Sequence, residues 1–217
     1  MKKSMNFFII LLFLFGLFVC SENSSGRVES ELKSYEGGEL SSINEFRENS
    51  IKGPQKVNIE KYRLKISGLV EEPKEYTYNH LLDSFPSKKR VETLNCVEGW
   101  SVKILWEGIP LKELLFESKP KEEVKTVIFR CHDGYTTSLK YQYIEDNNLL
   151  LAYKMNGIKL PEERGFPFQL MAAGKWGYKW AKWVIEIELI SDEEYRGFWE
   201  QKGYSNDASL DKNFFEE

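Results

Sequence analysis

The residue best suited to redox chemistry in this sequence is Cys96. A predicted strand over Val91 to Cys96 runs into Gly99, which favours a loop over Val97 to Ser101, so the cysteine lies at a strand end. A thiolate in that position is a soft ligand for a transition metal. Two other interpretations remain open, because a buried cysteine is most often a small apolar side chain and Cys96 could form a disulfide with Cys131.

The lysine-rich stretch Lys175 to Lys182 (KWGYKWAK) could bind an anion. Glycines at 174 and 177 let a ligand approach the backbone, and lysine ammonium groups bind phosphate. The same pattern would suit a surface strand whose tryptophans pack inward, or a platform for single-stranded nucleic acid. With 34 acidic against 30 basic residues and a net charge of -4, no global positive field favours a nucleic acid partner.

Zinc hydrolysis and haem chemistry are poorly supported. The two histidines, His80 and His132, lie far apart and have no zinc-type spacing with cysteines. Neither a C-x-x-C-H haem motif nor a Rossmann glycine pattern occurs in the sequence. Redox chemistry on this chain would therefore need a separate redox partner.

The N-terminus predicts export. An apolar run from Phe7 to Val19 has the character of a signal-peptide core and is shorter than the roughly 20 residues that span a bilayer. We expect residues 1–19 to be a signal peptide and Cys20 to be the lipidated residue of a bacterial-type lipoprotein. Because Val19 departs from the small residue usual before such a cysteine, an ordinary secretory peptide or an uncleaved anchor is the alternative.

The rest of the chain divides into a polar arm and one domain. Residues 20–56 are polar without a sustained period, so we expect a tether and an irregular arm, followed by a domain over residues 57–217. A short helix is expected to open at Pro110. Short helices among many strands favour an α+β fold with mixed sheets. The predicted strands are Tyr62 to Ser67, Val91 to Cys96, Val124 to Cys131, Leu149 to Tyr153, Phe168 to Ala172 and Trp183 to Ile190, and a second short helix covers Asn79 to Asp83.

Two local patterns are more specific than these. Asn156-Gly157 predicts a tight hairpin turn. In the last strand, alternation places Trp183, Ile185 and Ile187 on one face and glutamates on the other, so we expect one covered and one wet face.

The segment from Asn95 to Leu115 contains the most specific motif. It runs Cys96-Val97-Glu98-Gly99-Trp100-Ser101 and then Trp106-Glu107-Gly108-Ile109-Pro110-Leu111. This resembles the C-V-x-x-W-S and W-x-G-x-P-L signature of the sulfite oxidase and periplasmic methionine sulfoxide reductase catalytic family. Further matches follow in the same order, so the resemblance runs from about Ser41 to the C-terminus. It implies a sulfite-oxidase-type molybdopterin-binding fold.

The resemblance also implies a cofactor and its contacts. In that family a cysteine thiolate binds molybdenum beside the dithiolene of one pterin, which would make Cys96 the metal ligand and molybdenum-molybdopterin the cofactor. Two departures matter, because Cys131 stands where the sulfoxide reductases have threonine and Gln169 stands where the family usually has arginine, with Arg164 nearby to compensate. By alignment, the residues that would touch the cofactor are Asn44, Glu45, Cys131, Arg164, Gln169, Lys179, Trp180, Ala181 and Lys182.

The activity implied by the resemblance is two-electron oxygen-atom transfer to or from a small sulfur or nitrogen oxo compound. The redox partner would be a membrane haem protein or a soluble cytochrome, and a tether at Cys20 would keep the enzyme near it, on the outer face of the cytoplasmic membrane or in the periplasm. Lys2-Lys3 stands where exported family members carry a twin-arginine signal. The second hypothesis is a cofactor-free binding or scaffold domain of the same fold with a disulfide between Cys96 and Cys131.

Overall fold

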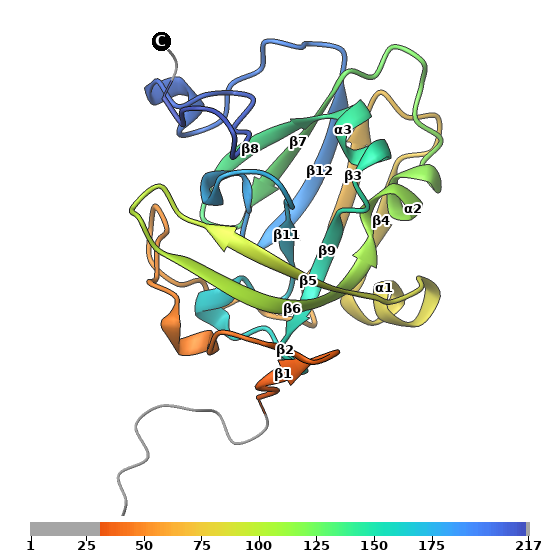
Figure 1. Ribbon diagram of the computed structural model, residues 1–217. Coiled ribbons are helices and arrows are strands. Elements are labelled where there is room, and N and C mark those ends of the chain that lie inside the picture. Colours follow the sequence, from red (N-terminus) through yellow and green to blue (C-terminus); the bar gives the residue numbers. More distant parts are fainter. Residues whose placement is uncertain (1–30, 216–217) are drawn as a thin grey trace, which may run out of the picture.

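The computed structural model describes residues 31–215, which fold around two five-stranded sheets (Figure 1). The predicted signal peptide, residues 1–19, and Cys20 lie outside the described residues. The first sheet has the order β10-β9-β6-β5, with β11 paired along β9, and all its pairings are antiparallel. Its strands are β5 (Lys88–Asn95), β6 (Ser101–Pro110), β9 (Leu150–Met155), β10 (Ile158–Lys159) and β11 (Gln169–Met171).

The second sheet has the order β4-β3-β12-β7-β8. Strands β3 and β12 are parallel and the other neighbours are antiparallel, so the sheet is mixed. Apolar side chains of both sheets meet in one core cluster that includes Leu64, Trp106 and Val127. The strands of this sheet are β3 (Leu64–Gly68), β4 (Lys74–Tyr76), β7 (Thr126–Cys131), β8 (Thr136–Lys140) and β12 (Val184–Ile190).

The helices are short, which together with the mixed sheet confirms the predicted α+β class. Helix α1 begins after Thr77, whose hydroxyl accepts the N–H of His80 (3.2 Å), and α2 begins after Pro110 as the sequence predicts. Within residues 31–215 no helix has the length and apolar character needed to cross a membrane. The helices are α1 (Tyr78–Ser84), α2 (Leu111–Phe116) and α3 (Tyr141–Asp146), and 3-10 turns occur at η1 (Ile43–Glu45), η2 (Glu162–Arg164), η3 (Gly177–Lys179) and η4 (Glu200–Lys202).

The sequence prediction has no strand between Ser101 and Pro110, where the structure has strand β6. The strand pairs with both β5 and β9, and its register with β9 shifts between Glu107 and Gly108. A Cβ atom on Gly108 would lie 2.6 Å from Cα of Ala152, so a side chain there would clash with the β9 backbone. The glycine therefore permits the close approach of β9 to β6, the strand that follows the cysteine loop.

Two other local predictions have different outcomes. The hairpin between β9 and β10 is confirmed, because Asn156 (φ 46°) and Gly157 (φ 81°) are both left-handed, as a two-residue type I′ turn requires. In β12 the register shifts between Val184 and Glu186, so Val184 takes the fully buried position and Ile185 is only half-buried. The expectation that Ile185 shares the fully covered face is wrong because a bulge breaks the alternation.

The described part of the predicted arm, residues 31–56, packs against the first sheet. Ile43 and Phe46 are buried in the core cluster. The carboxylate of Glu31 accepts the backbone N–H of Ile43 (2.6 Å) and the side-chain amide of Asn156 (2.8 Å). The arm is thereby fixed to the β9–β10 hairpin, along with its short ribbon of β1 (Ser34–Tyr35) and β2 (Gly38–Glu39).

Candidate active site

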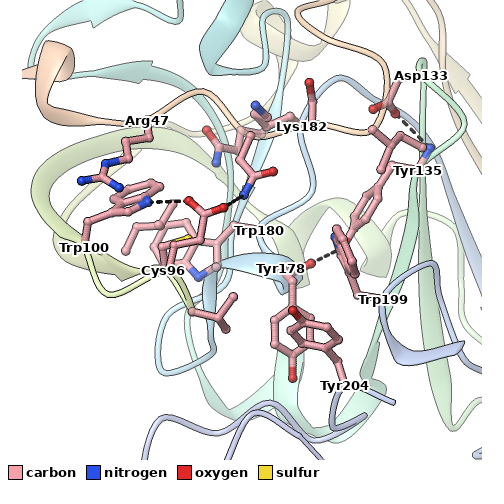
Figure 2. A pocket seen from close by; sticks show the side chains of 18 of the residues that line it. Arg47, Cys96, Trp100, Asp133, Tyr135, Tyr178, Trp180, Lys182, Trp199 and Tyr204 are labelled. Atoms are coloured by element: carbon pink, nitrogen blue, oxygen red, sulfur yellow. Dashed lines mark hydrogen bonds between the residues drawn. The ribbon is translucent and has the colours of Figure 1, made fainter. Parts of the chain in front are cut away.

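Cys96 lies in the turn that connects β5 to β6, at a strand end as the sequence predicts. Its backbone N–H donates to the carbonyl of Trp100 (2.9 Å), and its carbonyl accepts the N–H of Gly99 (3.1 Å). Gly99 has φ 83°, a left-handed conformation that suits glycine. The closed loop holds Cys96 in the wall of a cavity (Figure 2). The cavity has a volume of about 200 Å³, roughly ten times the volume that one buried water needs.

The Cys96 thiol is in an environment that opposes its ionisation without a metal. Burial raises its pKa above the usual value, the N–H groups of Glu98 and Val97 and the charge of Arg47 lower it, and the Glu98 carboxylate raises it. Cys96 and Cys131 are both free thiols, so the disulfide of the second hypothesis is absent from this structure. A single soft donor is thus available to a ligand in the cavity.

The arm contributes one wall of the cavity. Arg47 and Asn49 line it, and the Asn49 amide donates to Glu98 Oε1 (3.1 Å) while the indole N–H of Trp100 donates to Glu98 Oε2 (3.2 Å). The ring of Phe46 packs edge-on against Trp100, with centroids 6.0 Å apart. The arm therefore supports the loop that carries Cys96.

Asn44 and Glu45, which alignment predicts to touch the cofactor, lie outside the cavity lining. Both are exposed on η1, where Glu45 accepts the backbone N–H of Ser42 (2.9 Å) in a capping box. Arg47 and Asn49 come from the same arm a few residues later and do line the cavity.

A cationic side of the cavity contains Lys182. Its backbone bridges to Gln169, and both residues line the cavity. The Lys182 ammonium donates to Glu48 Oε1 (2.9 Å). Burial lowers the pKa of Lys182, Glu48 opposes this effect, and the nearby guanidinium of Arg164 lowers the pKa further. Arg164 donates to the carbonyl of Phe46 (3.2 Å), while its buried Nε has no hydrogen-bond partner among residues 31–215.

The lysine-rich stretch divides between the cavity and the core. Trp180 lines the cavity and its indole N–H donates to the carbonyl of Lys175 (3.0 Å). Ala181 is buried beside it, and Lys179 is fully buried in an ion pair with Glu200 (2.6 Å). Of the predicted site residues, the structure brings together Cys96, Gln169, Trp180 and Lys182 along the cavity, whereas Asn44, Glu45, Cys131, Arg164, Lys179 and Ala181 lie outside its lining.

Aromatic residues line the side of the cavity away from Cys96 (Figure 2). The hydroxyl of Tyr135 donates to the backbone carbonyl of Tyr178, and the hydroxyl of Tyr178 donates to the backbone carbonyl of Ser205 (2.7 Å). Trp199 and Tyr204 come from the C-terminal segment, with ring centroids 5.2 Å apart. The sequence offers one signal for Tyr135, which follows the Asp133-Gly134 turn, and none for the C-terminal pair.

Residues 51–199 match the family described as oxidoreductase molybdopterin binding domain. The chain is 32% identical over 152 residues to the uncharacterized oxidoreductase YuiH of Bacillus subtilis, covering 70% of this chain and 76% of the relative. It is also 32% identical over 151 residues to a candidate protein-methionine-sulfoxide reductase subunit, YedZ1 of Azospira oryzae, covering 70% of this chain and 57% of that protein.

A solved structure is also similar. The sulfane dehydrogenase SoxCD from Paracoccus pantotrophus superimposes with a TM-score of 0.61 and 27% identity. The superposition covers 64% of this chain and 41% of the SoxCD chain. The match therefore spans less than two thirds of SoxCD, and the same holds for YedZ1.

Proposed function

We propose that this chain, which belongs to the oxidoreductase molybdopterin binding domain family, is an exported molybdenum enzyme that exchanges an oxygen atom with a small sulfur or nitrogen oxo compound. Membership makes it a molybdopterin-binding oxidoreductase of the sulfite oxidase family. The observation that carries the finer proposal is Cys96, a free thiol in the wall of a cavity that is also lined by the half-buried cation Lys182.

The donor set of the cavity fits the cofactor. Cys96 supplies a soft sulfur, and the N–H groups of Val97 and Glu98 favour its thiolate form, which is the form that binds metal. The half-buried Lys182 lines one side of the cavity, and the buried Arg164 lies next to it outside the lining, with an unpartnered Nε that a phosphate oxygen would satisfy. When bound, the molybdenum pterin supplies a two-electron redox centre with exchangeable oxygen.

The residues of this chain would orient the reaction. Cys96 would hold the metal at the cavity wall, while Lys182 and Arg164 would fix the phosphate end of the pterin. Removal of one oxygen atom from an oxo compound consumes two electrons and two protons and releases water, and the opposite direction releases the electrons. We infer that these electrons pass to or from a separate membrane haem protein or cytochrome. A partner is supported by the description of YedZ1 as a subunit.

Export rests on the N-terminal sequence. The apolar run from Phe7 to Val19 and the following Cys20 support a lipid anchor on the outer face of the cytoplasmic membrane or in the periplasm. Such an anchor would keep the enzyme near a membrane partner and raise their effective concentration.

Elemental analysis of protein purified from its native host tests the proposal. We expect about one molybdenum per chain, none in Cys96→Ser, and retention of the metal in Cys131→Ser, which removes the buried thiol outside the cavity lining. Assays of the loaded protein with sulfite and with methionine sulfoxide would then identify the substrate class. Native protein without molybdenum, or a metal content unchanged in Cys96→Ser, would refute the proposal.

A further inference from the structure

The C-terminal segment folds back over the cavity after β12. The N–H of Phe198 donates to the carbonyl of Thr136 on β8 (2.9 Å). Gly197 lies so close to β8 that a Cβ atom there would be 2.7 Å from Cα of Thr137. The family match ends at residue 199, so the rest of the segment lies beyond it. Of the residues that this segment adds to the cavity lining, Trp199 is the last residue of the family match and Tyr204 lies beyond it.

A buried ion pair fixes this segment to the body of the domain. The Lys179 ammonium lies 2.6 Å from Glu200 Oε1, and both side chains have an exposed fraction of 0%. The same oxygen accepts the hydroxyl of Thr137 (2.6 Å), and the Lys179 ammonium also donates to the carbonyl of Ser138 (3.0 Å). Glu200 directly follows Trp199, so the pair determines where this tryptophan lies.

The fixed segment presents aromatic rings to the cavity. Trp199 and Tyr204 line it together with Tyr178, and Tyr204 lies 5.2 Å from each of the other two rings, between centroids. Figure 2 shows Trp199 and Tyr204 on one side of the view and Cys96 on the other, with Trp180 between them. The cavity thus has an apolar aromatic end opposite the thiol.

We propose that the C-terminal segment is the specificity element of this cavity, in which Trp199 and Tyr204 receive the apolar organic group of the substrate. This inference rests on the proposed function. It means that the segment favours an organic oxo compound over an inorganic oxyanion as the substrate. Ring faces carry negative potential, so they repel an anion, whereas burying an apolar substituent against them is favourable. Glu200 is a positioning residue, because it acts through Trp199.

Binding of methyl phenyl sulfone, measured by calorimetry, tests the aromatic end without turnover. We expect Trp199→Leu and Tyr204→Leu to weaken binding by about tenfold, the lower end of what an apolar contact contributes in a pocket. Tyr204→Phe keeps the ring and should bind like the unmodified protein. Trp176→Leu is the matched control, because Trp176 lies outside the cavity lining. Circular dichroism of each variant checks that the fold is retained.

Steady-state kinetics of the molybdenum-loaded protein provide the second readout. Trp199→Leu should raise KM for methyl phenyl sulfoxide about tenfold with kcat within about twofold, and should leave KM for sulfite unchanged. Equal sulfone affinity in folded Trp199→Leu, Tyr204→Leu and Trp176→Leu would overturn the inference. Because the sulfone experiment does not need the metal, absence of molybdenum would refute the proposed function without deciding this result.

Discussion

Replacing Glu200 by glutamine should destabilise the protein strongly, because it removes the negative charge that matches buried Lys179. Glutamine has the same shape as glutamate, so the effect reports on the charge alone. Lys179 would then remain as a buried ammonium with neutral acceptors, namely the glutamine amide oxygen, the carbonyl of Ser138 and the amide oxygen of Asn206 (3.3 Å). Removal of one partner from a buried pair costs about 3–5 kcal/mol. For a domain of this size that corresponds to a fall in Tm of about 6–20 °C.

The loss should also depend on pH. Burial lowers the pKa of Lys179 in the folded protein, and Glu200 opposes that effect, so Glu200→Gln lowers the pKa further. The Lys179 pKa values of the folded variant and of the folded unmodified protein define a pH window. Within this window, folded Lys179 has lost its proton in the variant and keeps it in the unmodified protein. Unfolded Lys179 titrates near its usual value of about 10.4 in both. In that window the variant binds a proton on unfolding and the unmodified protein does not, so the variant's free energy of unfolding rises with pH. The difference in free energy of unfolding between the two proteins should therefore shrink as pH rises through that window.

Urea unfolding at pH 7 and at pH 9.5 measures both effects. Glu193→Gln makes the same chemical change at an exposed position in the same C-terminal segment, and should alter the free energy of unfolding by less than about 0.5 kcal/mol at either pH. If Glu200→Gln lowered the free energy of unfolding no more than Glu193→Gln, the ion pair would not be what holds the segment in place.

Two further results are expected. Gly108→Ala should lower the free energy of unfolding by about 1–3 kcal/mol in urea titrations, because its Cβ would lie 2.6 Å from Cα of Ala152. A loss under about 0.5 kcal/mol would contradict the close approach of β6 and β9. In protein without metal, iodoacetamide should label Cys96 slowly at pH 7 and faster above about pH 8.5, since burial raises its pKa, whereas Cys131 should react only on unfolding. Mass spectrometry reads both sites, and molybdenum-loaded protein labelled equally fast at Cys96 would argue against metal ligation.

The position of Cys96 could be predicted because its causes are local. A strand followed by a glycine with positive φ makes a turn, and the spacing to Trp100 and Trp106 is readable in the sequence. The prediction had no strand β6 because Glu107 and Gly108 interrupt the alternation. That interruption is explained by β9, whose backbone approaches Gly108 from a distant part of the chain.

The walls of the cavity could not be predicted, because they depend on contacts between segments far apart in the sequence. Arg47 and Asn49 belong to a polar stretch that has no period of its own, and it is positioned by the burial of Phe46 against Trp100. Trp199 reaches the cavity from the opposite end of the chain. Composition and periodicity report on neighbours in sequence, so they carry little information about such contacts.

Lys179 and Lys182 show how the same local pattern can serve two purposes. Each lies beside an aromatic residue in one lysine-rich run, so both suit phosphate from the sequence alone. The turn η3 ends between them and directs Lys179 into the core, where its charge is matched by Glu200. Lys182 instead lines the cavity next to Arg164. Lys182 also has a carboxylate partner, Glu48, but it faces the cavity, whereas Lys179 is fully buried outside the cavity lining. An anionic cofactor would therefore be held by Lys182, with Arg164 beside it, while Lys179 fixes the C-terminal segment through Glu200.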